Sequence, residues 1–144
     1  MELGRIVALD IGGRRIGVAV SDPTRTLASP LTTLHAQPRS TVFSRIRRLL
    51  EEQEATALVV GLPVSLNGAI GPQAREVQQF VEELRPLIEI PIHFVDERLT
   101  SVAADRMMSE LGIRPEKRKE RIDQVAASLI LQDFLDADGR NRRE

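Results

Sequence analysis

The order of hydrophobic patterns along the 144 residues predicts a single-domain α/β fold, with a mixed β-sheet flanked by α-helices. Three short apolar segments come first and fit a meander of strands. Segments with strand and helix periodicity then alternate, which is typical of strands joined by crossover helices. A chain of this length can bury one substantial core, and we find no internal repeat.

The first three strands are expected at residues 5–11, 15–21 and 27–34. The first, RIVALDI, is almost entirely apolar, as expected for a central strand that is covered on both faces. The Gly12–Gly13 turn leads into the second strand, so the two form a hairpin. Pro30 has no N–H to donate, which places the third strand at an edge or at a bulge.

The remaining boundaries follow from helical spacing, capping residues and turn-rich loops. We expect a helix over about 42–50, a strand at 57–61, a helix that begins at Pro72, a strand at 90–97, a helix from Thr100 or Ser101 to Leu111, and a final helix over about 122–136. Residues 114–121, RPEKRKER, are predicted to be a basic loop. The domain is expected to cover residues 1–138, with a short basic tail at 139–144.

Composition excludes several kinds of site. Cysteine is absent, which excludes disulfides and thiolate zinc sites and suits a reducing cytoplasm. The chain has two histidines, so a zinc centre with several histidines is not expected. No apolar run approaches the roughly 20 residues of a membrane span, and residues 1–10 do not resemble a signal peptide. We therefore expect a cytoplasmic protein with no membrane partner; a net charge of −1 does not decide on nucleic acid.

Acidic residues stand at the ends of two predicted strands. Asp10 closes the first strand, and Asp96 and Glu97 close the last. Because ligand sites in α/β sheets form at the carboxyl ends of strands, these acids can meet at one edge of the sheet. Taken singly, Asp10 also fits a turn before glycine, and the Asp96–Glu97 pair also fits a helix lead-in.

A third acid, Asp123, lies on the predicted final helix. At 100° per residue it shares a face with the apolar Ala127, Ile130 and Phe134. A carboxylate in that position loses hydration, which is unfavourable unless a positive charge compensates it. The alternative is an acid at a helix start whose charge reaches solvent.

Three carboxylates that converge repel one another and need a cation in order to stay ionised together. Oxygen ligands without cysteine suit Mg²⁺ or Mn²⁺, and such ions support cleavage of phosphodiester bonds. Arg14 and Arg15, close to Asp10 in the sequence, then become candidates for binding the substrate phosphate.

Competing motifs are weaker. Residues 12–17, GGRRIG, have the glycine spacing of a phosphate loop, but the Lys-Ser/Thr pair is missing and a strand follows. The hairpin is also similar to the phosphate turn of actin-like kinases, which enclose nucleotide between two such domains, whereas this chain supplies one. Tyrosine and tryptophan are absent, so we expect recognition of backbone and shape.

Four ordered motifs resemble the YqgF family of bacterial proteins, which have a ribonuclease H-like fold and are described as Holliday-junction resolvases and as pre-16S rRNA nucleases. The motifs are LDIGGRRIGVAVSD, VVGLPVSLNG, VDERLTS and RIDQVAASLILQDFL, and the similarity runs from about Ile6 to Leu135. The resemblance implies a five-stranded mixed sheet flanked by helices. It also selects Glu97 over Asp96, so that Asp10, Glu97 and Asp123 match the acidic triad that binds metal and catalyses cleavage.

The resemblance has one visible departure. The family commonly has Asp-Gly after the GLP motif, where this chain has Asn67–Gly68, and we expect a turn and a substrate contact there. Nucleic-acid contacts are expected from Arg14, Arg15, Asn67, Arg98, Lys117, Arg118, Lys119 and Arg121.

The resemblance implies a metal-dependent nuclease for structured nucleic acid, with precursor 16S rRNA as the expected partner and branched DNA as the alternative. Paired cuts in a Holliday junction need a two-fold dimer, and we expect a monomer or a weak homodimer. A different hypothesis is a catalytically silent RNA-binding or regulatory module. The three mutually repelling carboxylates argue against it, because binding alone gives no reason to keep them.

Overall fold

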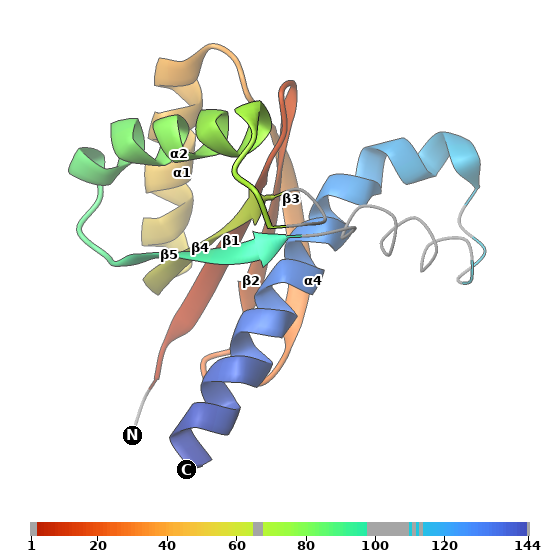
Figure 1. Ribbon diagram of the computed structural model, residues 1–144. Helices are drawn as coiled ribbons and strands as arrows, with labels where there is room; N and C mark the ends of the chain where they lie inside the picture. Colours follow the sequence, from red (N-terminus) through yellow and green to blue (C-terminus); the bar gives the residue numbers. More distant parts are fainter. Residues whose placement is uncertain (1–2, 65–67, 98–109, 111, 113, 144) are drawn as a thin grey trace.

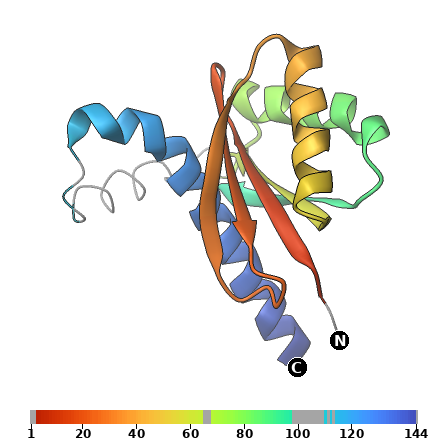
Figure 2. The same ribbon diagram turned by 180° about the vertical axis from the view of Figure 1, so that it is seen from behind.

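A computed structural model shows three layers, with a β-sheet between helices on both faces (Figures 1 and 2). The structure describes residues 3–64, 68–97, 110, 112 and 114–143. Its elements are β1 (Arg5–Ile11), β2 (Arg15–Ser21), β3 (Ala28–His35), α1 (Arg39–Glu52), β4 (Ala55–Pro63), α2 (Pro72–Leu84), the 3₁₀ helix η1 (Arg85–Leu87), β5 (Ile92–Glu97) and α4 (Pro115–Arg143). Across these residues the sheet has five strands in the order β3-β2-β1-β4-β5. β2 is antiparallel to β1 and β3, whereas β1, β4 and β5 are parallel, so the sheet is mixed as expected.

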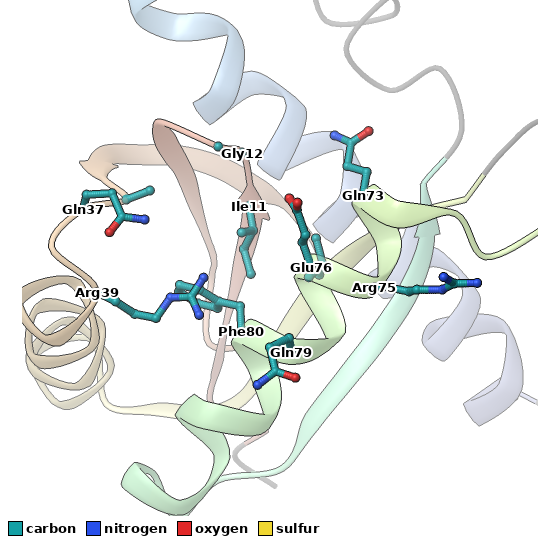
Figure 3. Close-up of a pocket in the computed structure, with 12 residues that line it drawn as sticks. Ile11, Gly12, Gln37, Arg39, Gln73, Arg75, Glu76, Gln79 and Phe80 are labelled. Atoms are coloured by element: carbon teal, nitrogen blue, oxygen red, sulfur yellow. The ribbon is translucent and has the colours of Figure 1, made fainter.

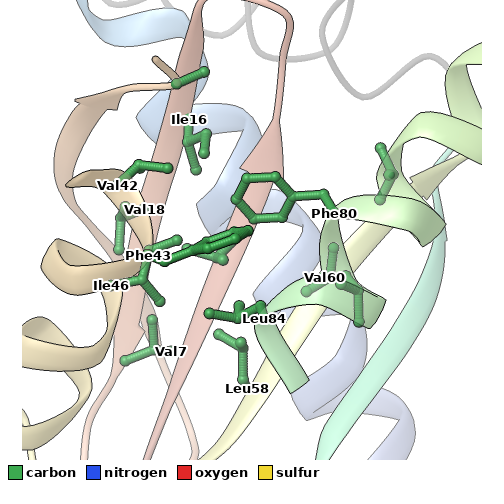
Figure 4. Packing of buried hydrophobic residues seen from close by; sticks show 14 of the residues in the cluster. Val7, Ile16, Val18, Val42, Phe43, Ile46, Leu58, Val60, Phe80 and Leu84 are labelled. Atoms are coloured by element: carbon green, nitrogen blue, oxygen red, sulfur yellow. The ribbon is translucent and has the colours of Figure 1, made fainter. Parts of the chain in front are cut away.

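Alternation along the strands divides the core into two clusters. On β1, Val7 and Leu9 face α1 and α2, where the rings of Phe43 and Phe80 meet edge to face at 4.9 Å (Figure 4). The intervening β1 residues face α4 instead. Since Asp10 follows the α4-facing Ala8 by two positions, its side chain belongs to the α4 face.

The α4 face of the sheet carries small side chains. Ala8, Ala19 and Ala57 pack in the cluster against this helix, and Gly17 and Gly61 continue their strands by the same two-residue period. A Cβ atom on Gly17 would lie only 1.9 Å from the Asp123 carbonyl oxygen. The helix backbone therefore rests directly on β2, and the missing side chain sets how close α4 can lie.

The strand predictions for the hairpin and for β3 are confirmed. β1 and β2 pair antiparallel through the glycine turn, and β3 is an edge strand. The register between β2 and β3 shifts where Ala19 pairs with Pro30, which places the expected irregularity at the proline.

The prediction of a basic loop at 114–121 is wrong, because α4 begins at Pro115 and includes most of that stretch. Proline suits the first turn of a helix, and lysine, arginine and glutamate are good helix formers. Hydrophobic periodicity marks the part of α4 that packs on the sheet, whereas the first turns extend away from it (Figure 1). Residues 139–143, predicted as a tail, are also helical. The helix predicted from Thr100 or Ser101 lies outside the described residues.

Two polar contacts attach β3 to α4. Gln132 accepts a hydrogen bond from the Ala28 N–H at 2.9 Å and donates one to the Thr26 carbonyl at 3.0 Å. In the preceding turn, the Asp22 carboxylate accepts hydrogen bonds from the Leu27 N–H, the Thr24 hydroxyl and the Thr26 N–H, and these hold its pKa well below the ordinary range. Among the described helices, none has the length and apolar character that crossing a bilayer requires.

We expect Gly17→Ala to destabilise the protein by about 2–3 kcal/mol, because the new methyl group collides with the backbone of α4. Gly13→Ala is the matched control, since a Cβ atom there meets no other atom within 4 Å. Its effect should stay within about 1 kcal/mol. Chemical denaturation of both variants measures the difference, and equal stabilities would show that α4 does not rest on Gly17.

Candidate functional site

Asp10 and Glu97 meet at the carboxyl edge of the parallel strands. β4 lies between their strands, and Glu97 pairs in register with Pro63 of β4. A Cβ atom on Gly61 would lie 2.8 Å from the Glu97 Oε2 atom. Because Gly61 has no side chain, the Glu97 carboxyl can reach over β4 and hydrogen-bond to Asp10.

The two carboxyls share a proton at neutral pH. Burial raises the pKa of Asp10 to about 6, although the hydrogen bond with Glu97 lowers it and the Asp123 charge raises it. Burial also raises the pKa of Glu97 to about 8, and the Asp10 charge and hydrogen bond add to this effect. The pair therefore holds a proton more tightly than two separate carboxyls would.

Asp123 supplies the third carboxylate from α4. Its backbone rests on Gly17, and its Oδ2 atom accepts a hydrogen bond of 2.8 Å from the Arg15 Nε atom. The Asp123 side chain is 20% exposed and that of Arg15 is 46% exposed. Arg15 thus supplies the positive charge that we expected beside Asp123 on its apolar helix face. Its guanidinium binds this carboxylate of the protein itself.

The alternation along β5 separates Asp96 from Glu97. Val95 packs in the cluster under α4, and Glu97 follows it by two positions on the same face. Asp96 is exposed and belongs to the other face. Glu97 is therefore the acid of this pair that lies beside Asp10.

The donor chemistry fits a small divalent cation. Two half-buried carboxyls lie together with raised pKa values, and the third carboxylate is paired with an arginine, so each of these oxygen donors would gain from a bound cation. Among the described residues, no group of three histidine, cysteine or acidic side chains is arranged to hold a metal ion. Asp10 and Glu97 could hold an ion after loss of their proton, and Asp123 after exchange of Arg15.

The other predicted contact residues lie in different parts of the chain. Arg14 is exposed in the hairpin turn, and Arg121 is exposed on α4, two residues before Asp123. Asn67 and Arg98 lie outside the described residues. For three further residues the structure gives a helical backbone and no side-chain description: Lys117, Arg118 and Lys119.

Sequence reasoning did not identify Gly17 and Gly61 as parts of the site. Each lies inside a strand, and an interior strand glycine typically marks a close approach of another group. That pattern could have indicated both positions, although not which group approaches them.

Comparison with known proteins identifies close relatives. A family model described as "RuvX: Holliday junction resolvase" matches residues 4–137. A protein of Roseiflexus sp. (strain RS-1), named "Putative pre-16S rRNA nuclease", is 69% identical over 136 residues, which cover 94% of this chain and 96% of that protein. A protein of the same name from Chloroflexus aggregans is 52% identical over 132 residues, with 92% and 93% covered. These matches confirm the family resemblance of the four motifs.

Solved structures support the ribonuclease H-like fold. RuvC of Thermus thermophilus, in complex with a Holliday junction substrate, has a TM-score of 0.56 at 14% identity and covers 94% of this chain and 95% of its own. The fowlpox virus Holliday junction resolvase has a TM-score of 0.54 at 14% identity, with 92% and 99% covered. At such identities the likeness concerns the fold alone.

The raised pKa values give a pH prediction. The metal-free protein should lose stability as the pH rises from about 4 to about 8, because over that range the folded state keeps protons on Asp10 and Glu97 that the unfolded chain has already lost. Glu97→Gln keeps a hydrogen-bond donor beside Asp10 and removes the upper titration, so its stability should fall less over this range. Thermal unfolding in EDTA at several pH values measures the slopes.

Glu89→Gln is the matched control for this experiment, because Glu89 is exposed and lies outside the acidic cluster. Its slope should equal that of the parent. Identical slopes in the parent and Glu97→Gln would contradict the shared proton.

Proposed function

Because the chain belongs to the RuvX family of Holliday junction resolvases, we propose that it is a metal-dependent nuclease that hydrolyses phosphodiester bonds of structured nucleic acid. The names of its relatives favour precursor 16S rRNA as the substrate. The observation that carries the proposal is the meeting of Asp10 and Glu97 at the carboxyl edge of the parallel strands, where the pKa of each is raised. Mg²⁺ or Mn²⁺ is the cofactor that these oxygen donors suit, and the cytoplasm is the proposed location.

Asp10, Glu97 and Asp123 are the proposed ligands and catalytic residues. When bound, a divalent cation supplies Lewis-acid stabilisation of charge on the phosphate and favours ionisation of the attacking water. The protein's own contribution is to hold the carboxylates in place through buried strand ends and the rigid contact of α4 with Gly17. Partial burial also reduces the hydration of Asp10 and Glu97, which would strengthen their electrostatic interaction with a bound cation.

Arginines stand close to these acids in the sequence on two elements. Arg14 and Arg15 lie in and beside the hairpin turn, and Arg121 lies one helical turn or less before Asp123. We assign these arginines, together with Asn67, Arg98 and the basic start of α4, to contacts with phosphates. Such contacts position a strand without reading its sequence, and they make binding sensitive to salt.

Branched DNA is the second candidate substrate, because the family description itself names Holliday junction resolvases. Both candidates use the same hydrolysis, so the distinction lies in the shape of the nucleic acid. Junction resolution additionally requires two copies of the site that face two strands.

The decisive experiment compares cleavage of precursor 16S rRNA and of a four-way DNA junction by the purified protein in Mn²⁺. We expect cleavage of the RNA, and loss of activity by a factor on the order of 10² or more in Asp10→Asn and Glu97→Gln. Asp96→Asn removes the same charge on the other face of β5 and should retain activity. Symmetric cuts in the junction with intact RNA would assign branched DNA, and tight binding without cleavage of either would favour the silent module.

A second prediction concerns the ion pair. Arg15→Gln should raise Mn²⁺ affinity by about two- to fivefold, because it frees Asp123 from a partly exposed ion pair of up to about 1 kcal/mol. Arg14→Gln is the matched control, since it removes a neighbouring positive charge outside that pair. Isothermal titration with Mn²⁺ measures both variants. A lower affinity in Arg15→Gln would instead mean that Arg15 orients Asp123 as a ligand.

A further inference from the structure

We propose that a cavity beside the Gly12–Gly13 turn binds an unpaired nucleotide of the substrate strand, next to the phosphate that is cleaved at the acidic cluster. The cavity has a volume of about 810 Å³ and lies between this turn and the first residues of α1 and α2 (Figure 3). A volume of that size is typical of sites that enclose small molecules. The inference rests on the proposed nuclease function and names the form of substrate that the site accepts.

The cavity lies on the face of the sheet opposite to α4. Ile11 lines it and packs against the core cluster under α1 and α2, as do Val77 and Phe80. Asp10, one residue earlier, faces α4. The acids and the cavity therefore occupy the two sides of one strand end.

Carboxamide groups line the walls of the cavity. Gln37 precedes α1, whereas Gln73 and Gln79 come from α2, and all three are exposed residues. Amide groups can both donate to and accept from the edges of bases. Glu76, the acid in the lining, can accept from an exocyclic amino group. This mixture suits a base better than it suits a bare phosphate.

Arg39 provides a flat surface on which a base can stack. Its Nη1 atom lies 2.6 Å from the Glu83 Oε2 atom, and its guanidinium lies over the Phe80 ring at 5.5 Å from the centroid. The Arg39 side chain remains 40% exposed, whereas Phe80 beneath it is 3% exposed. The guanidinium is thus held in one orientation with its outer side open, and arginine planes stack on unpaired bases.

The glycine turn connects the two sides. Gly12 and Gly13 line the cavity and follow Asp10 within three residues, and a Cβ atom on Gly13 would meet no other atom within 4 Å. The two glycines therefore place no side chain between the acids and the cavity, so a nucleic-acid strand can cross the turn at this point. A base can enter only when it is not paired, because a duplex keeps its bases stacked inside the helix. The cavity accordingly favours single-stranded flanks over fully paired arms.

Binding can be measured without cleavage, using fluorescence anisotropy in EDTA. The probes are a short fluorescein-labelled single-stranded RNA and the blunt duplex of the same sequence. The double variant Gln37→Ala/Gln73→Ala should weaken single-strand binding by about tenfold and leave duplex binding within about twofold. Gln78→Ala is the control, since Gln78 lies beside Gln79 on α2 and does not line the cavity.

A conservative exchange separates stacking from charge. Arg39→Lys keeps the positive charge and removes the planar group, so it should weaken single-strand binding alone. Arg47→Lys makes the same exchange two turns further along α1 and should have no effect. Circular dichroism verifies that each variant is folded.

Equal losses for single strand and duplex, or no loss for either, would overturn the proposal. The outcome is independent of nuclease chemistry, because no metal is present in the binding assay. Failure of the proposed function would appear instead as an absence of cleavage by the parent protein, with the single-strand preference intact.

Discussion

The close approach of α4 to the sheet is the constraint on which the site depends. At Gly17 the helix backbone lies so near the strand that a methyl group would overlap the Asp123 carbonyl oxygen. That contact places Asp123 near Asp10 and Arg15, which come from the adjacent strands of the hairpin. Gly61, on β4 of the same sheet, has a similar role, because it leaves space for both Ile130 and the Glu97 carboxyl. The absence of side chains at Gly17 and Gly61 therefore allows the acids to come together.

This packing brings together charges that oppose one another, and the protein offsets their repulsion in two ways. Asp10 and Glu97 are half-buried together with raised pKa values, which favour retention of a proton, whereas Asp123 pairs with Arg15. Neither solution is as favourable as an apolar contact at the same place, because buried carboxyls lose hydration. A structure that needed only stability would not keep three such groups at one edge. The arrangement is understandable if both the proton and the arginine give way when a cation and a phosphate bind.

Much of this could be predicted from the sequence, because alternation and strand order depend on local patterns. Asp10 and Glu97 end parallel strands, so their meeting at one edge follows from topology once the strands are recognised. The reach of Glu97 across β4 does not follow, since it depends on a side chain that Gly61 lacks. The Arg15–Asp123 pair joins residues 108 positions apart, which no local pattern reveals. Hydrophobic periodicity predicts only part of α4. The first turns of this helix are rich in charged residues and extend away from the sheet, so the sequence shows no apolar period there.

The hairpin between β1 and β2 gives the edge of the sheet two different sides. Successive residues of a strand point to opposite faces, so Asp10 belongs with α4 and Ile11 with α1 and α2. One face therefore presents buried carboxyls, and the other presents an open cavity with carboxamides and a fixed guanidinium. Charge development during hydrolysis requires the rigid, water-poor face, whereas a nucleotide that enters and leaves requires the open one. The Gly12–Gly13 turn is a suitable boundary between the two faces, because its glycines have no side chains that would obstruct a nucleic-acid strand.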